Sequence, residues 1–156
     1  MRATITHLHT ANTHLCIMVL TTLLCFSTIA APFALQSYGE NHYNDPTNPA
    51  CSSVHAETNA LKKLMPLPRQ KKLKKLDLLV IRVSKSGQLG NSKPCIHCIL
   101  TLAKNLPEKG YSLCKVYYTN EYGDIVCSQF NELLHETNPH VSRFYMEKKF
   151  KLKSQI

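Results

Sequence analysis

The chain has 156 residues, of which 44% are hydrophobic and only five are glycine. This composition excludes a fibrous or wholly disordered protein, and the length favours one domain with a substantial core. Nineteen Lys and Arg residues against ten Asp and Glu residues give a formal net charge of +9. Such a surplus favours anionic partners such as nucleotides or nucleic acids, although it also serves solubility.

Residues 1–32 form an apolar N-terminal segment that has two interpretations. No Lys, Arg, Asp or Glu occurs between Ala3 and Gly39. The segment either supplies the first strand of a sheet or is a signal peptide or membrane anchor. Its Thr and Ser content and Pro32 favour the strand. Secretion or membrane contact is expected only under the second interpretation.

The first half of the chain predicts two strands and a helix. Apolar stretches at residues 14–24 and 33–38 predict the strands, and a loop rich in Asn, Asp and Pro follows. Ser52 or Ser53 can cap a helix that Pro66 ends. The basic segment, residues 62–75, holds seven Lys and Arg residues. It is either a solvated helix end and linker or a patch that contacts phosphate.

The third quarter of the chain predicts a buried strand and a second helix. Residues 76–83 are nearly all apolar, which suits a central strand, and a turn-rich loop runs from there to Ser92. Pro94 stands where a helix start favours proline, and we expect this helix to end before Pro107.

The last part of the chain predicts an antiparallel pair of strands and a short helix. Residues 114–119 and 125–127 flank a tight turn, and residues 130–135 have a helical pattern. The element order predicts the α/β class, with one mixed sheet of about five strands and helices on its faces. Residues 139–156 are expected to form a basic C-terminal tail.

Residues that bind metal ions stand at both predicted helix starts. His55 opens the first helix, while Cys95 and Cys98 open the second at a spacing that places both sulfurs on one helical face. A helix N-terminus also favours the thiolate form. Three nitrogen and sulfur ligands are the set that a catalytic zinc site uses, with the fourth position left for water. We therefore expect zinc as the cofactor.

Two features of the zinc prediction have alternatives. Glu57 lies beside the predicted site and is placed to move protons as the catalytic residue. A structural zinc site would instead need a fourth ligand, which Cys51 or His97 could supply. Seven cysteines, an odd number, argue against a disulfide framework. Thiolate ligands need a reducing environment, so we expect an intracellular protein, in the cytoplasm or nucleus.

Together, His55-Ala56-Glu57 and Pro94-Cys95-Ile96-His97-Cys98 resemble the signature of the cytidine and deoxycytidylate deaminase superfamily. That signature is H-x-E followed by P-C-x-x-C. The resemblance implies a cytidine-deaminase-like sandwich and a zinc deaminase domain over residues 33–138. It further implies hydrolytic deamination of a cytosine-type base, with Glu57 moving protons and ammonia leaving.

The same resemblance implies a set of substrate contacts. Asn41 would contact the sugar, and the Ala56 N–H with the backbone carbonyls of Ser92 and Lys93 would hold the base. The substrate would be cytidine, CMP, dCMP or a base in single-stranded nucleic acid, and a homo- or hetero-oligomer is compatible with this. The alternative function is a catalytically idle zinc-binding module that binds RNA or a protein partner through the basic segment. Glu57 favours the enzyme.

Overall fold

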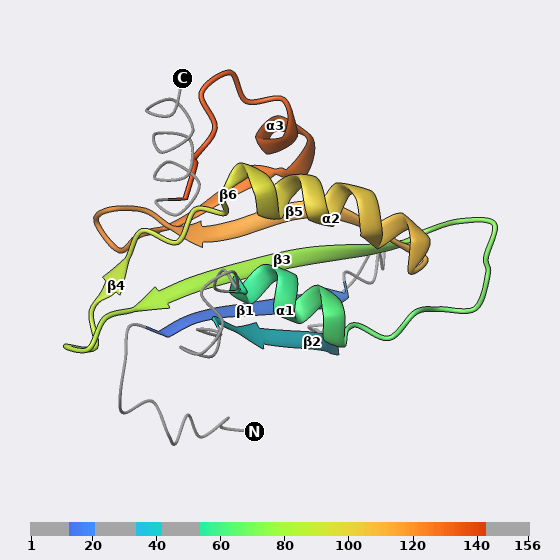
Figure 1. Ribbon diagram of the computed structural model, residues 1–156, viewed down its shortest axis with the longest axis horizontal. Helices are drawn as coiled ribbons and strands as arrows, with labels where there is room; N and C mark the ends of the chain where they lie inside the picture. Colours follow the sequence, from blue (N-terminus) through green and yellow to red (C-terminus); the bar gives the residue numbers. More distant parts are fainter. Residues whose placement is uncertain (1–12, 21–33, 42–53, 143–156) are drawn as a thin grey trace, which may run out of the picture.

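The computed structural model describes residues 13–20, 34–41 and 54–142. Within these ranges the chain is an α/β protein with three helices and one mixed sheet (Figure 1). The strands lie in the order β2-β1-β3-β5-β6, and the short strand β4 pairs with β3. The α/β class and the mixed sheet expected from the sequence are confirmed. In the described part of the chain, no helix combines the length and apolarity needed to cross a membrane.

The strand β1 (Thr13–Leu20) lies inside the sheet, between β2 (Ala34–Glu40) and β3 (Lys74–Val83). It is antiparallel to both neighbours. Residues 13–20 therefore form a strand, as the first interpretation of the N-terminal segment predicts. Residues 1–12 and 21–33 lie outside the described residues.

The helix α1 (Ala56–Lys63) packs closely against β2 because Gly39 has no side chain. A Cβ atom at Gly39 would overlap the Ala56 carbonyl oxygen and the Ala60 nitrogen. The hydroxyl of Ser37, also on β2, donates to the Ala60 carbonyl at 2.7 Å. The position of α1 therefore depends on β2.

The start of α1 differs from the prediction. His55 is the N-cap residue, and its side chain makes no capping hydrogen bond. The Asn41 Oδ1 atom, just after β2, accepts a hydrogen bond from the Ala56 N–H at 2.7 Å and so supplies the missing acceptor. Local spacing could not reveal this cap because it comes from another element. The predicted caps, Ser52 and Ser53, lie outside the described residues.

The helix α2 (Ile96–Glu108) connects β4 (Leu89–Gly90) to β5 (Tyr111–Thr119). The prediction that it ends before Pro107 is wrong, because the helix includes this proline in its last turn. A proline there removes only one helical hydrogen bond. The Lys109 N–H continues the pattern by donating to the carbonyls of residues 105 and 106.

The sheet combines parallel and antiparallel pairing. β3 and β5 are parallel, whereas β6 (Ile125–Gln129) is antiparallel to β5, as the tight turn predicted. The short last helix is α3 (Phe130–Leu134). β4 lies within the predicted turn-rich loop, where its two residues pair with the end of β3.

The core lies between the sheet and the helices α1 and α2, which run side by side across one face (Figure 1). Fully buried side chains from both layers meet there. They include Ala60, Leu64, Leu76, Leu78, Val80, Ile99, Leu102, Leu106 and Val116. Because both helices begin at the same end of the sheet, their first residues meet in one place.

Candidate metal centre

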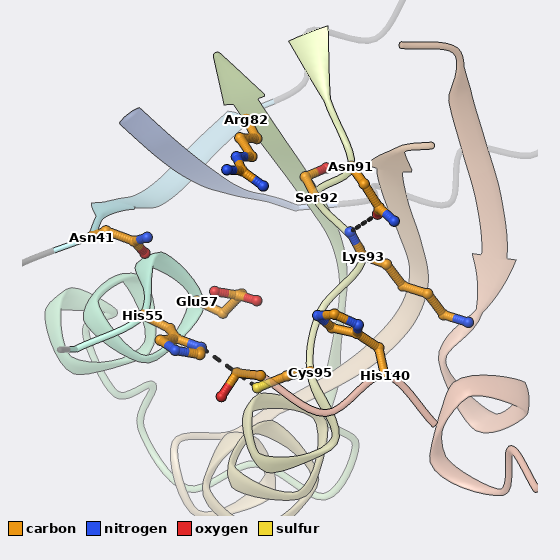
Figure 2. Close-up of a pocket in the computed structure, with 10 residues that line it drawn as sticks. Asn41, His55, Glu57, Arg82, Asn91, Ser92, Lys93, Cys95 and His140 are labelled. Carbon is orange, nitrogen blue, oxygen red and sulfur yellow. Dashed lines mark hydrogen bonds between the residues drawn. The ribbon is translucent and has the colours of Figure 1, made fainter. Parts of the chain in front are cut away.

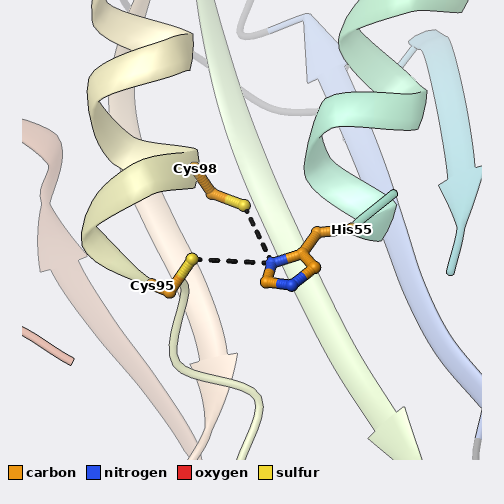
Figure 3. Close-up of side chains that lie close together, drawn as sticks. All are labelled: His55, Cys95 and Cys98. Atoms are coloured by element: carbon orange, nitrogen blue, oxygen red, sulfur yellow. Dashed lines mark hydrogen bonds between the residues drawn. The ribbon is translucent and has the colours of Figure 1, made fainter. Parts of the chain in front are cut away.

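The N-terminal ends of α1 and α2 bring three metal-binding side chains together. His55 precedes α1, Cys95 is the N-cap residue of α2, and Cys98 lies in the first turn of that helix. Figure 3 shows both sulfurs pointing toward the imidazole of His55. The His55 Nδ1 atom lies 3.5 Å from the Cys95 Sγ atom and 3.2 Å from the Cys98 Sγ atom.

These distances fit the donor set of a tetrahedral metal site. Metal–sulfur bonds near 2.3 Å and metal–nitrogen bonds near 2.0 Å place the nitrogen and sulfur donors about 3.5 Å apart. The donor atoms of His55, Cys95 and Cys98 all lie within 4.8 Å of one another. The three residues are therefore close enough to coordinate a metal ion. No fourth His, Cys, Asp or Glu joins the group among the residues that the structure describes.

The two cysteines differ in their acidity. The hydrogen bond with Cys98 is the main cause that lowers the pKa of the Cys95 thiol to about 4, and His55 acts in the same direction. Their mutual hydrogen bond and burial raise the pKa of Cys98. Without a cation the pair keeps one proton, and a cation that binds both sulfurs displaces it.

Glu57 is the acidic group beside the metal ligands. It lies in the first turn of α1 and is only 6% exposed. Burial raises the pKa of its carboxyl group above the ordinary value, because water is withdrawn from the charged form. The pKa of His55 is also raised, mainly by its hydrogen bond with Cys95.

A neighbouring hydroxyl supports the Cys98 sulfur. The Thr58 Oγ1 atom lies 3.9 Å from the Cys98 Sγ atom, within hydrogen-bonding distance for sulfur. This contact joins α1 to α2 beside the metal ligands. Thr58 was not predicted, although its place one residue after Glu57 on the same helix is a signal that is visible in the sequence.

Two of the candidate metal ligands, His55 and Cys95, line a cavity of about 500 Å³ (Figure 2). Glu57 and Arg82 reach into it from α1 and β3. This volume lies within the range of small-molecule sites. The described residues that line it are Asn41, His55, Glu57, Arg82, Asn91, Ser92, Lys93, Cys95, His140 and Ser142.

Three of the residues predicted to bind substrate, Asn41, Ser92 and Lys93, line this cavity, whereas Ala56 is not among its lining residues, and several of the four already have partners. The Asn41 side chain accepts the Ala56 N–H, so these two predicted contacts bond to each other. The Ser92 hydroxyl donates to the Val80 carbonyl and also bonds to Thr119, so only its backbone carbonyl can serve a base. A role of these residues in substrate binding remains a prediction.

Lys93 lines the cavity, and both its backbone N–H and its ammonium group already have partners. Its N–H donates to the Asn91 Oδ1 atom at 3.0 Å, which shapes the loop before Cys95. Its ammonium group pairs with Glu136 at 2.6 Å. The charge of Lys93 is therefore already balanced by a carboxylate.

Four further lining residues were not predicted: Arg82, Asn91, His140 and Ser142. Arg82 is a charge at the end of an apolar strand, and that contrast is visible in the sequence. His140 and Ser142 fall within the expected C-terminal tail, yet the His140 carbonyl accepts a hydrogen bond from the Ile96 N–H at 2.8 Å. That contact places residues 140–142 beside the first turn of α2, a long-range relation that spacing does not show.

The basic segment lies away from the metal centre. The Leu67 N–H donates to the Lys109 carbonyl, and the Tyr111 hydroxyl donates to the Met65 carbonyl. The segment thus follows the C-terminal ends of the helices, as Figure 1 shows, whereas the metal ligands are at the N-terminal ends. At 1.5 Å per residue, the length of α2 separates the two places by about 20 Å.

Comparisons with protein-family models, with curated proteins and with solved structures find no match for this chain.

Proposed function

We propose that this protein is a zinc-dependent hydrolase that deaminates a cytosine-type base. One observation carries the proposal: His55 and Cys95, two of the three residues close enough to coordinate a metal ion, line the same cavity as the buried carboxyl of Glu57. A metal-ligand group alone would serve a structural purpose equally well. A buried carboxyl group next to it at a cavity provides acid–base chemistry.

The donor set supports zinc as the metal. One imidazole and two thiolates are the nitrogen and sulfur donors that zinc prefers, whereas calcium and magnesium require oxygen donors. Three described protein donors leave a coordination position for water, as in catalytic zinc sites. When bound, zinc lowers the pKa of a coordinated water to about 7 and so supplies a nucleophile at neutral pH.

Glu57 would move the protons of the reaction. Deamination consumes one water and releases one ammonia, so the two protons of the attacking water must be passed on, one to the ring nitrogen and one to the departing amine. Burial raises the pKa of Glu57, which makes its carboxylate a better base than an exposed one and lets it return the proton later.

The arrangement of elements also supports the deaminase proposal. The superfamily resemblance implies that the H-x-E and P-C-x-x-C motifs each open a helix beside one mixed sheet. In this protein α1 follows His55 and α2 follows Cys95, and β3 lies between the two helices in the chain. The finer assignment, a cytidine-deaminase-like sandwich with five main strands, is part of the proposal.

The proposal is tested by ammonia release from cytidine, CMP, dCMP and a single-stranded oligonucleotide. We expect turnover of at least one, and Glu57→Gln should lower kcat by about 10²- to 10⁴-fold because the proton carrier is lost. Zinc content should stay at one equivalent in this variant. Glu108→Gln removes an exposed carboxylate at the far end of α2 and should retain activity.

The idle zinc-binding module is the second candidate, and the exposure of the basic segment favours it. The basic segment lies far from the metal centre, so a partner that binds to the basic segment need not enter the cavity. If the protein binds one equivalent of zinc and turns over none of these compounds, the enzyme proposal fails. The module would then be supported by RNA binding that weakens steeply as the salt concentration rises. This salt dependence should be steeper in the wild type than in a variant that carries Lys71→Gln and Lys72→Gln.

A further inference from the structure

The cavity beside the metal centre contains one cationic side chain that has no partner in the described ranges. Arg82 lines the cavity at the end of β3 and is partly buried. In the described ranges its guanidinium group makes neither a hydrogen bond nor an ion pair, in contrast to the ammonium group of Lys93, which is paired with Glu136. A partly buried arginine that has no counter-ion attracts an anionic ligand.

The neighbouring strand leaves space for this side chain. Gly90 on β4 is the register partner of Arg82. A Cβ atom at Gly90 would lie 3.5 Å from the Arg82 Cδ atom and 3.9 Å from its Nε atom, so the arginine stem crosses the bare backbone of β4. Figure 2 shows the guanidinium group directed into the cavity. The arginine is therefore held by its stem while its head stays available.

A second polar group of the cavity also lacks a partner. The Ser142 Oγ atom is buried and makes no hydrogen bond with the residues that the structure describes. Ser142 lines the same cavity as Arg82. A buried hydroxyl without a partner is costly unless a ligand or water satisfies it. The cavity therefore offers a cation and an unsatisfied hydroxyl in addition to the metal-binding group.

We propose that the substrate is a nucleoside monophosphate and that Arg82 binds its phosphate. This inference rests on the proposed deaminase function and specifies its substrate. The guanidinium group matches a phosphate through two parallel hydrogen bonds. The base then lies toward Glu57 and the metal ligands, and Arg82 acts as the residue that distinguishes a nucleotide from a nucleoside.

The cavity favours a single nucleotide over a polynucleotide. Proteins that hold single strands stack successive bases on aromatic side chains along a basic groove. None of the described lining residues is Phe, Tyr or Trp, and the basic segment lies at the opposite end of the helices. A volume of about 500 Å³ suits one small molecule.

The test compares CMP with cytidine on the full-length, zinc-loaded protein. Both kcat/KM and the dissociation constant are measured, the latter by calorimetry, so that binding is followed apart from turnover. We expect the wild type to prefer CMP and Arg82→Gln to lower the CMP-to-cytidine preference by about 10- to 100-fold. Arg82→Lys should restore part of the preference, since it keeps the charge but loses the paired hydrogen bonds.

Lys85→Gln is the matched control, because Lys85 is exposed in the turn after β3 and does not line the cavity. It should leave the preference for CMP unchanged. Inorganic phosphate provides a measurement that needs no variant: it should compete with CMP in the wild type and should not compete with cytidine to the same extent.

Equal binding of CMP and cytidine by the wild type would overturn the proposal, as would a preference that Arg82→Gln does not change. An oligonucleotide turned over more efficiently than CMP would show that the substrate is a polynucleotide and would also overturn it. Failure of the proposed function is distinguishable. If CMP binds through Arg82 but no compound is deaminated, the phosphate site stands and the deaminase proposal fails.

Discussion

Each of the three metal-binding residues contributes one donor atom, and each donor binds a cation only after it has lost its proton. The pKa of His55 is raised by Cys95, and the pKa of Cys98 is raised by its contact with Cys95 and by burial. Protons therefore compete with the metal at two of the three positions, while Cys95, with a pKa of about 4, is already a thiolate at neutral pH.

We expect the apparent zinc affinity to rise with pH across the neutral range. His55 keeps its proton to a higher pH than an ordinary histidine, so lowering the pH strengthens the competition and weakens binding. Competition with a chromophoric chelator at several pH values measures the affinity. An affinity that does not change with pH would contradict these protonation states.

Cys98→Ser should reduce zinc content below one equivalent, because it replaces a thiolate donor with a hydroxyl that binds zinc poorly. Cys51→Ser should leave the zinc content unchanged if the fourth position is open for catalysis. Metal analysis of the purified variants measures both. Loss of zinc in Cys51→Ser would instead indicate a structural site with four protein ligands.

The sequence was sufficient to predict the three residues that lie close enough to coordinate a metal ion and part of the cavity wall, but it did not predict Arg82, Asn91, His140 and Ser142. His55, Cys95 and Cys98 stand at fixed short spacings from helix starts, and such local relations can be read from the chain. Arg82 and Ser142 become relevant only through the pairing of β3 with β4 and the return of the chain after α3. Those are long-range contacts, which one sequence does not encode in any local pattern.

At the scale of elements, the metal centre depends on how two helices rest on the sheet. α1 is held by β2 at Gly39 and Ser37, whereas α2 is held by β5 and α1. Most strands and helices were predicted because their apolar periods are regular. The two-residue strand β4 and the last two helical residues of α2, Pro107 and Glu108, were missed. Pairing with β3 and the remaining helical hydrogen bonds outweigh the local turn and proline preferences.

Gly39→Ala should displace α1 and so disturb the metal centre. The added methyl group would overlap backbone atoms of α1, which cannot move aside as a side chain can. We expect a loss of about 1–3 kcal/mol in the free energy of unfolding and weaker zinc binding. Urea denaturation and metal analysis measure the two effects.

Gly90→Ala is the matched control for Gly39→Ala, because its Cβ atom would meet the nearest neighbour at 3.5 Å, an ordinary contact distance. The free energy of unfolding of this variant should change by less than that of Gly39→Ala. Equal losses in the two variants would contradict the close approach of α1 to Gly39 as the cause of the effect.

At the scale of the whole molecule, a bound metal would join parts of the chain that are distant in sequence. His55 is 40 residues from Cys95 and 43 residues from Cys98. A ligand that binds only the folded chain shifts the unfolding equilibrium toward the native state. The metal would therefore contribute to stability as well as to chemistry.

Removal of zinc by a chelator should lower the Tm of the wild type. At a free zinc concentration 100-fold above the dissociation constant, binding adds about 2.7 kcal/mol of stability. Scanning calorimetry with and without chelator measures the shift. The Tm of Cys98→Ser should respond much less, and an equal response in both proteins would place the stabilising metal elsewhere.

The interior position of β1 has a consequence for how the protein is made. β1 is synthesised first among the described strands, but its partner β3 is completed only after β2 and α1. Until then the apolar strand Thr13–Leu20 presents an unpaired edge, which is a template for aggregation. A fragment that ends before β3, residues 1–72, should aggregate in light-scattering measurements under conditions in which the full chain stays dispersed. The yield of folded protein during translation would then depend on how soon β3 leaves the ribosome.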